Sequence, residues 1–195
     1  NIQNAIRFLL SGNTGAILVV LYATLFALPA PFAPVHLLFI NLLTDSLPAI
    51  AIGLEPHNKK VMYERPRDIR QPLLSKSFAT KVALEGAVIA IATIIAFEIG
   101  RQTDTITAST MAFATLCLAR LFHGFNCRSK QPLYKIGLFS NKQSWLAFLA
   151  GVILLHIVLL IPALSGVFEV AALDWSQLFI IYGLSIIPLV VVQLW

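Results

Sequence analysis

The sequence predicts an all-α fold, namely a polytopic membrane helical bundle of six transmembrane helices. Of its 195 residues, 58% are hydrophobic and 12% are charged, and the mean hydropathy is +0.83. A soluble domain carries about 25% charged and about 45–50% apolar residues. One ordinary core cannot hide this apolar excess, which excludes a soluble globular enzyme. Six spans of about 20 residues use about 120 residues and leave about 75 for the polar stretches between them.

The six spans are expected at residues 12–28, 34–53, 78–100, 107–125, 144–163 and 175–195. Pro29, Pro31 and Pro34 end the first span and restrict its connection to the second to a tight, uncharged turn. The basic segment 54–77 separates the second span from the third, and a polar turn near Gly100 separates the third from the fourth. The basic segment 126–143 precedes the fifth span, and the acidic segment 165–174 precedes the sixth.

Lysine and arginine are concentrated on one side of the expected membrane. Twelve of the 14 Lys and Arg residues, Arg7 and Lys81 included, lie near the N-terminus or in and beside segments 54–77 and 126–143. Arg101 lies on the other side, and Arg120 lies within a span. The positive-inside rule makes both loops and both chain ends cytoplasmic. This distribution accounts for the net charge of +5 without nucleic acid, so the expected partner is the lipid bilayer.

The chain begins at Asn1 rather than Met and stops at Trp195 inside an apolar run, so we expect it to be part of a longer protein. It contains no phosphate-binding loop of the G-x-x-x-x-G-K-[ST] type and no H-E-x-x-H zinc motif. Cys117 and Cys127 are ten residues apart. That spacing corresponds to about 15 Å along a helix, too far for a disulfide, so both are expected to be reduced thiols.

The second span carries the polar cluster with the clearest chemistry. Asn41, Thr44 and Asp45 are at positions i, i+3 and i+4, which places them on one face of a regular helix. Inserting Asp45 at bilayer depth costs about 2.5–3.5 kcal/mol, so the carboxylate needs a partner or a bound cation. Amide, hydroxyl and carboxylate oxygens suit calcium or magnesium, and Pro48 frees backbone carbonyls nearby. A polar helix–helix contact remains the alternative.

Two further polar residues are candidates for the same site. Asn13, between Gly12 and Gly15 in the first span, either adds an oxygen ligand or packs against a neighbouring helix. Arg120, in an apolar stretch of the fourth span, keeps its charge. Its guanidinium either extends to the cytoplasmic surface or pairs with Asp45.

The remaining polar residues of the spans are expected to have no part in ion transport. His123 is predicted at the membrane interface, one turn closer to the basic loop than Arg120. Glu85 and Glu98 are near the ends of the third span, where hydration or local hydrogen bonds suffice. His36 and His156 are isolated histidines without ligand spacing around them.

The second span and the loop after it resemble the sixth membrane helix and adjoining cytoplasmic loop of type II P-type cation ATPases. The matching residues are Asn41-Leu42-Leu43-Thr44-Asp45, Leu47-Pro48-Ala49, Leu54-Glu55-Pro56, Val61-Met62, Arg65-Pro66-Arg67 and Pro72-Leu73. The stretch from Arg7 to Gly15 is similar to the start of the family's fifth helix. The chain is thus identified as the C-terminal membrane domain, residues 1–195, with the fifth to tenth helices of such an ATPase, most like a bacterial calcium-transporting member of the plasma-membrane and sarcoplasmic-reticulum calcium pump group.

This resemblance implies that Asn13, Asn41, Thr44 and Asp45 are calcium ligands. Ala16 and Arg120 stand where the sarcoplasmic-reticulum pump has liganding glutamates. The resemblance therefore implies one calcium ion exported per cycle, with a proton carried back by a glutamate of the fourth helix, which is outside this chain. Arg120 then substitutes for the missing ion as the charge partner of Asp45.

The resemblance also assigns the energy supply to parts outside the chain. A cytoplasmic domain binds ATP and magnesium and is phosphorylated, and loop 54–77, with Arg65, Arg67 and Arg70, docks on it. The fragment alone is therefore expected to be inactive, and the complete pump is expected in the plasma membrane. Three alternatives remain open: a P-type pump for manganese, magnesium or sodium, a six-span secondary carrier or channel, and a non-transporting anchor.

Overall fold

The computed structural model describes residues 1–55, 75–129 and 131–194, and these contain helices and no strand. Six helical segments of this described part are long and apolar enough to cross a membrane. They are α1 (Ile2–Leu25), the segment Pro34–Gly53, α4 (Lys76–Arg101), α5 (Thr105–Asn126), α7 (Lys142–Leu160) and α9 (Trp175–Leu194). The predicted all-α bundle with six membrane-spanning helices is confirmed.

The segment Pro34–Gly53 consists of α2 (Pro34–Phe39), the wide turn η1 (Ile40–Thr44) and α3 (Ser46–Gly53). Two short helices, α6 (Leu133–Ile136) and α8 (Pro162–Phe168), lie in connections. Helix α1 begins ten residues before the predicted first span, because polar residues of its first turns have partners: Asn4 donates to the Arg128 carbonyl at 3.0 Å, for example. The other helices end within three residues of the predicted bounds.

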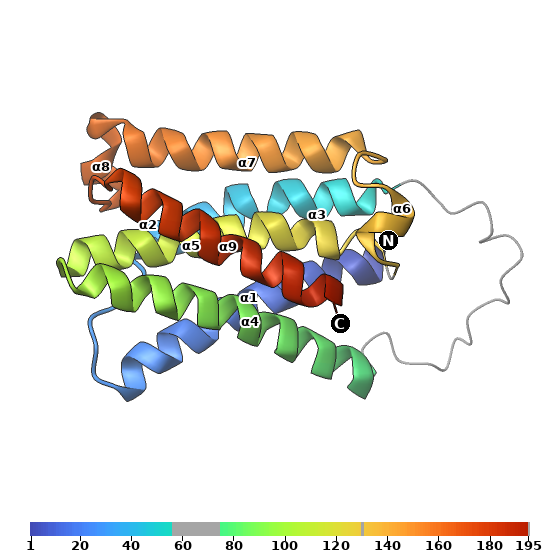
Figure 1. The fold of residues 1–195 in the computed structure, drawn as a ribbon, viewed down its shortest axis with the longest axis horizontal. Helices are drawn as coiled ribbons and strands as arrows, with labels where there is room; N and C mark the ends of the chain where they lie inside the picture. The colour runs from blue at the N-terminus through green and yellow to red at the C-terminus, as the bar shows by residue number, and fades with distance from the viewer. Residues whose placement is uncertain (56–74, 130, 195) are drawn as a thin grey trace, which may run out of the picture.

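Helix α5 lies at the centre of the bundle and packs against α4, α9, α7 and α1 (Figure 1). It is buried almost throughout, because small side chains let neighbouring helices approach closely. A Cβ at Gly100 of α4 would lie 2.6 Å from the Cα of Ala108. Helices α7 and α9 instead expose large apolar side chains such as Leu146 and Phe179, as expected of surfaces that face lipid.

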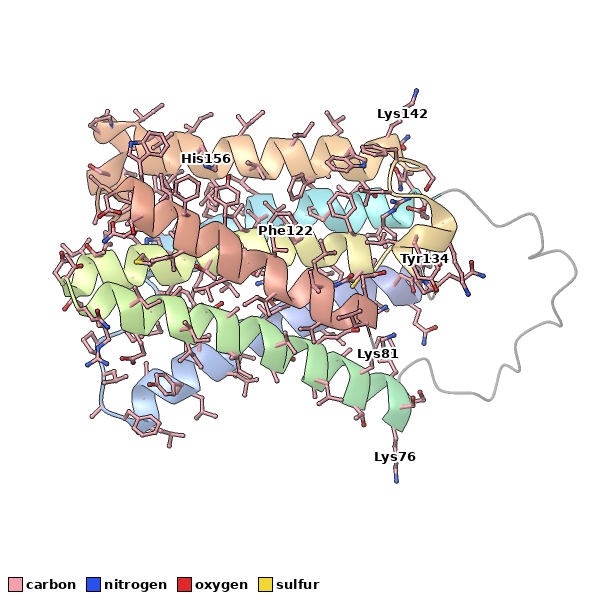
Figure 2. All side chains as sticks on the ribbon, viewed as in Figure 1. Lys76, Lys81, Phe122, Tyr134, Lys142 and His156 are labelled. Carbon is pink, nitrogen blue, oxygen red and sulfur yellow. The ribbon has the colours of Figure 1, made fainter. Side chains whose placement is uncertain are left out.

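Both chain ends and α6 lie at one end of the bundle, whereas α8 and the turns between α1 and α2 and between α4 and α5 lie at the other (Figure 1). Lys76 and Lys142 point outward at the end that carries both termini, and Lys81 lies at the same end (Figure 2). Most of loop 54–77 is outside the described residues, and so are Arg65, Arg67 and Arg70.

A buried ion pair holds the start of loop 54–77 against segment 126–143. Arg128 donates to both carboxylate oxygens of Glu55, at 3.0 and 2.8 Å, and Asn141 donates to the same carboxylate at 2.5 Å. The side chain of Asn1 donates to the carbonyls of Gly53 and Glu55, at 3.1 and 2.8 Å. The beginning of α1, the end of α3 and segment 126–143 therefore form one connected unit.

Candidate ion-binding site

Three segments bring Arg120, Asp45 and Asn13 together in the middle of the bundle. One terminal nitrogen of Arg120, on α5, lies 2.5 Å from Oδ2 of Asp45 and 3.0 Å from Oδ1 of Asn13 on α1. Arg120 is 1% exposed and Asp45 is 4% exposed. The guanidinium does not reach the surface, so the alternative in which Arg120 extends to the cytoplasmic side is wrong, and the predicted pairing with Asp45 is present.

The backbone widens at η1, immediately before Asp45. The N–H of Asp45 donates to the carbonyl of Ile40 at 2.9 Å, an i to i+5 bond in place of the usual i to i+4 bond. Thr44 and Asp45 are buried, whereas Asn41 is exposed among the described residues. The prediction that all three share one helical face assumed a regular α-helix, and the wide turn departs from that spacing.

This local geometry leaves oxygen atoms available beside Arg120. Oδ1 of Asp45 is buried and has no hydrogen-bond partner among the described residues. The hydroxyl of Thr44 donates to the carbonyl of Ile40 at 3.0 Å, which leaves its lone pairs available. Pro48 has no N–H to donate to the Thr44 carbonyl. The site thus combines a carboxylate, an amide, a hydroxyl and a backbone carbonyl, all hard oxygen donors of the kind that calcium and magnesium take.

Gly12 determines where the Arg120 guanidinium can lie. A Cβ at Gly12 would be 2.4 Å from Nε and 2.6 Å from Cζ of Arg120, so only glycine permits this position. The neighbour of Gly12 is thus a charged side chain rather than another backbone. Gly86 of α4 is the residue that brings α1 and α4 close, since a Cβ there would lie 2.9 Å from the carbonyl oxygen of Ser11.

We expect Gly12→Ala to weaken ion binding with a modest effect on folding. The added methyl group displaces the guanidinium from Asp45 and Asn13, and rearranging a buried charged hydrogen bond costs about 1.5–3 kcal/mol. Thermal unfolding and cation affinity of the full-length protein measure the two effects. Gly53→Ala is the matched control, since a Cβ at Gly53 meets no atom within 4 Å. Equal cation affinities in the two variants would contradict this role of Gly12.

A second buried polar cluster lies nearer the end that carries the termini, and the sequence did not predict it. Arg7 of α1 donates through Nε to both carboxylate oxygens of Glu85 on α4, at 3.0 and 2.8 Å. Nε2 of His123 lies 2.9 Å from the hydroxyl of Ser11 and 3.3 Å from the sulfur of Cys127. Glu85 is satisfied by hydrogen bonds, one of the two possibilities expected for it, and the side chains of Glu85 and His123 are both 0% exposed.

The remaining polar residues have local partners. Glu98 accepts from Tyr22 at 3.1 Å and from Arg101 at 2.6 Å near the outer end of α4, as expected. His36 lies 2.7 Å from the carbonyl of Phe168, and His156 lies 3.0 Å from the hydroxyl of Tyr182. Both cysteines are free and buried, which confirms the prediction of two thiols.

Comparison with known proteins agrees with this architecture. The family model described as "Cation transporting ATPase, C-terminus" matches residues 29–195. The chain belongs to this family. It is therefore a C-terminal membrane domain of the P-type cation ATPases, which confirms the resemblance found from Asn41 to Pro56.

Several curated relatives of this ATPase domain are calcium-transporting ATPases. The Calcium-transporting ATPase of Bacillus subtilis is 38% identical over 191 residues, which cover 96% of this chain and 22% of that protein. Calcium-transporting ATPase 1 of Lactococcus lactis is 35% identical over 196 residues, covering 100% of this chain and 22% of the relative. The human Calcium-transporting ATPase type 2C member 2 is 31% identical over 189 residues, which cover 95% of this chain and 20% of that protein. The chain thus spans about a fifth of the length of these relatives.

Proposed function

We propose that this domain is the ion-translocating membrane part of an ATP-driven pump that exports calcium from the cytoplasm. The observation that carries the proposal is the carboxylate of Asp45, buried in a membrane-spanning segment with one oxygen held by Arg120 and the other without a partner among the described residues. A buried carboxylate in this state is a typical cation ligand. The oxygen donors of Asp45, Asn13 and Thr44 and the names of the relatives both favour calcium.

In this proposal Asp45, Asn13 and Thr44 supply oxygens from two neighbouring segments, and Asn41 completes the set from the exposed side of η1, where further helices of the complete protein pack. Arg120 supplies a permanent positive charge in the space that a second ion would need. Ala16 offers no side-chain oxygen. One calcium ion per cycle follows, and the counter-transported proton is assigned to a carboxylate outside this chain.

Energy reaches this site from domains outside the chain, which bind ATP with magnesium and undergo phosphorylation. Loop 54–77, with Arg65, Arg67 and Arg70, is proposed to dock on the phosphorylation domain. The support comes from the described start of that loop, where Glu55 forms an ion pair with Arg128 and accepts a hydrogen bond from Asn141. A displacement of the loop would therefore pull on α1, α3 and α7 together.

The domain is a multi-pass membrane protein, and we propose that it lies in the plasma membrane with both ends cytoplasmic. Both termini and the labelled lysines Lys76, Lys81 and Lys142 lie at one end of the bundle (Figure 2). The acidic segment with Glu169 and Asp174 follows α7 toward the other end. The positive-inside rule assigns the lysine-bearing end to the cytoplasm.

Single cysteines test this orientation. Lys135→Cys, in the exposed part of α6, and Asn58→Cys, outside the described residues, are expected to react only with thiol reagents that enter the cell. Gln102→Cys, exposed at the opposite end, is expected to react in intact cells with impermeant reagents. Cys117 and Cys127 are buried and add little background. Labelling of Lys135→Cys from outside intact cells would show that the domain has the opposite orientation in the membrane.

The function itself is tested by ATP hydrolysis of the full-length protein across a panel of cations. We expect micromolar calcium to stimulate hydrolysis and phosphorylation, and manganese, magnesium and sodium to do so less. Stronger stimulation by one of those three cations would identify that cation, rather than calcium, as the transported ion. The absence of any cation-stimulated phosphorylation would instead favour the non-transporting anchor. Membership of an ATPase family already argues against the secondary carrier or channel.

A further inference from the structure

We propose that Glu85, His123 and Cys127 form a second cation site, separate from the Asp45 site, for zinc or a similar borderline-soft divalent ion. The inference does not rest on the proposed calcium transport. It rests on the buried cluster that joins α1, α4 and α5 and that the proposed transport mechanism does not use.

The ligand atoms of these three residues already converge. They lie within 4.8 Å of one another, and all three residues are buried. Nε2 of His123 is 3.3 Å from Sγ of Cys127 and 3.5 Å from Oε2 of Glu85. A tetrahedral zinc ion with bonds of about 2.0–2.3 Å holds its ligand atoms about 3.3–3.6 Å apart. The two distances to Nε2 are therefore those of a zinc coordination sphere.

The arrangement around Nε2 also exceeds what one imidazole nitrogen can satisfy by hydrogen bonds. Glu85, Cys127 and the Ser11 hydroxyl all approach this atom, which has either one proton or one lone pair. A metal ion placed among them would contact all of these atoms at once, with Ser11 Oγ or a water as the fourth ligand. Cys127 directly follows the last residue of α5 with helical backbone angles, four residues after His123, so the two side chains lie on the same side of the helix end.

The donor set distinguishes this site from the Asp45 site. Thiolate and imidazole ligands select zinc or cadmium over calcium, which takes oxygen ligands. Zinc binding would release the Cys127 thiol proton to solvent and leave the neutral ring of His123 protonated on Nδ1. The amide nitrogen of Asn126 lies 3.4 Å from Nδ1 and also donates to the Pro188 carbonyl at 3.2 Å. Arg7 would stay bonded to Oε1 of Glu85 and offset part of the anionic charge.

A hollow lies beside the cluster at the end of the bundle that carries the termini. This hollow of about 260 Å³ lies between the start of α1 and the start of α4, and Arg7 forms part of its wall. Other residues that line it include Gln3, Asn4, Ser75, Ser77 and Phe78. Arg7 connects this hollow to the cluster, because it lines the hollow together with Lys81 and donates to Glu85.

The test uses the full-length protein, stripped of metal with a chelator and titrated with zinc or cadmium. Bound zinc is counted by equilibrium dialysis, and cadmium is detected by its thiolate charge-transfer absorption in the ultraviolet. We expect Cys127→Ser to bind zinc at least tenfold more weakly than the unmodified protein and to lose one equivalent of the cadmium–thiolate signal. Cys117→Ser is the matched control, a buried cysteine on the same helix that is expected to retain both.

Two further variants keep the test decisive. Glu85→Gln, which retains the thiol, is expected to weaken zinc binding as well, and it covers the case in which Cys127→Ser fails to fold. Asp45→Asn is expected to leave zinc binding unchanged, so loss of calcium transport and loss of zinc binding are separable results. Unchanged zinc binding in Cys127→Ser or Glu85→Gln, loss of the signal in Cys117→Ser instead, or no zinc bound by the unmodified protein would overturn the proposal.

Discussion

Asp45→Asn in the full-length protein is expected to abolish calcium-stimulated phosphorylation. The substitution removes the buried anionic oxygen that has no partner among the described residues and leaves Asn13 and Thr44 as neutral donors beside the positive charge of Arg120. A divalent cation would then meet a site of net positive charge in a medium of low dielectric constant. Phosphorylation from labelled ATP at increasing calcium concentrations measures the loss. Wild-type calcium affinity in this variant would refute the proposed role of Asp45.

The same substitution leaves Arg120 buried without its partner, which destabilises proteins by about 3–5 kcal/mol. Loss of calcium response could therefore reflect misfolding alone. The double variant Asp45→Asn/Arg120→Met separates the two effects, because it removes both charges together. We expect it to regain most of the thermal stability lost in Asp45→Asn but none of the calcium response. Glu98→Gln, a carboxylate-to-amide change away from the site, is expected to leave the calcium affinity unaltered. If the double variant regained calcium-dependent phosphorylation, Asp45 would be a purely structural partner of Arg120.

Equilibrium binding to the full-length protein is expected to give one calcium ion per phosphorylation site. Arg120 lies 2.5 Å from Asp45 and occupies the space between α1 and η1. Two unit charges about 4 Å apart have an interaction energy of about 4 kcal/mol at an effective dielectric constant of 20. The repulsion between the guanidinium and a divalent cation at that distance is about twice as large. We therefore expect the guanidinium to exclude a second cation. Two ions bound per phosphorylation site would contradict this prediction.

Arg120→Met tests the same point from the other direction. Without the guanidinium, the Asp45 carboxylate has no built-in counter-charge when the calcium site empties, and calcium loses its repulsive neighbour. We expect calcium to bind at least tenfold more tightly and to be released more slowly, so that turnover falls. Arg120→Lys is the matched control, because it keeps the charge and is expected to stay closer to the unmodified protein. Identical calcium binding in Arg120→Met would show that Arg120 does not act on the ion.

The spans and the candidate ion ligands could be predicted from the sequence because the relevant signals are local. Insertion of a segment into the membrane depends on its own hydropathy, and the order of Lys and Arg along the chain follows the sides of the bilayer. A carboxylate in an apolar membrane span is rare because inserting its charge is costly, whatever residues surround it. Asp45 was therefore a candidate ligand before its neighbours were known. The order of motifs from Arg7 to Pro56 indicated the family for the same reason.

Only the tertiary structure decided which polar groups meet. Arg120 is 75 residues from Asp45 and 107 from Asn13, and its direction depends on how α5 is rotated and on the space left by Gly12. Asn41 lies in the wide turn η1 and is exposed, whereas Asp45 directly after this turn is buried, a difference that the regular spacing in the sequence did not indicate. Arg7, Glu85 and His123 likewise lie on three different helices, so each is an isolated polar residue in the sequence. Hydropathy records how much of each helix avoids water but not its rotation or its neighbours, and these are set by the close packing of side chains from distant segments.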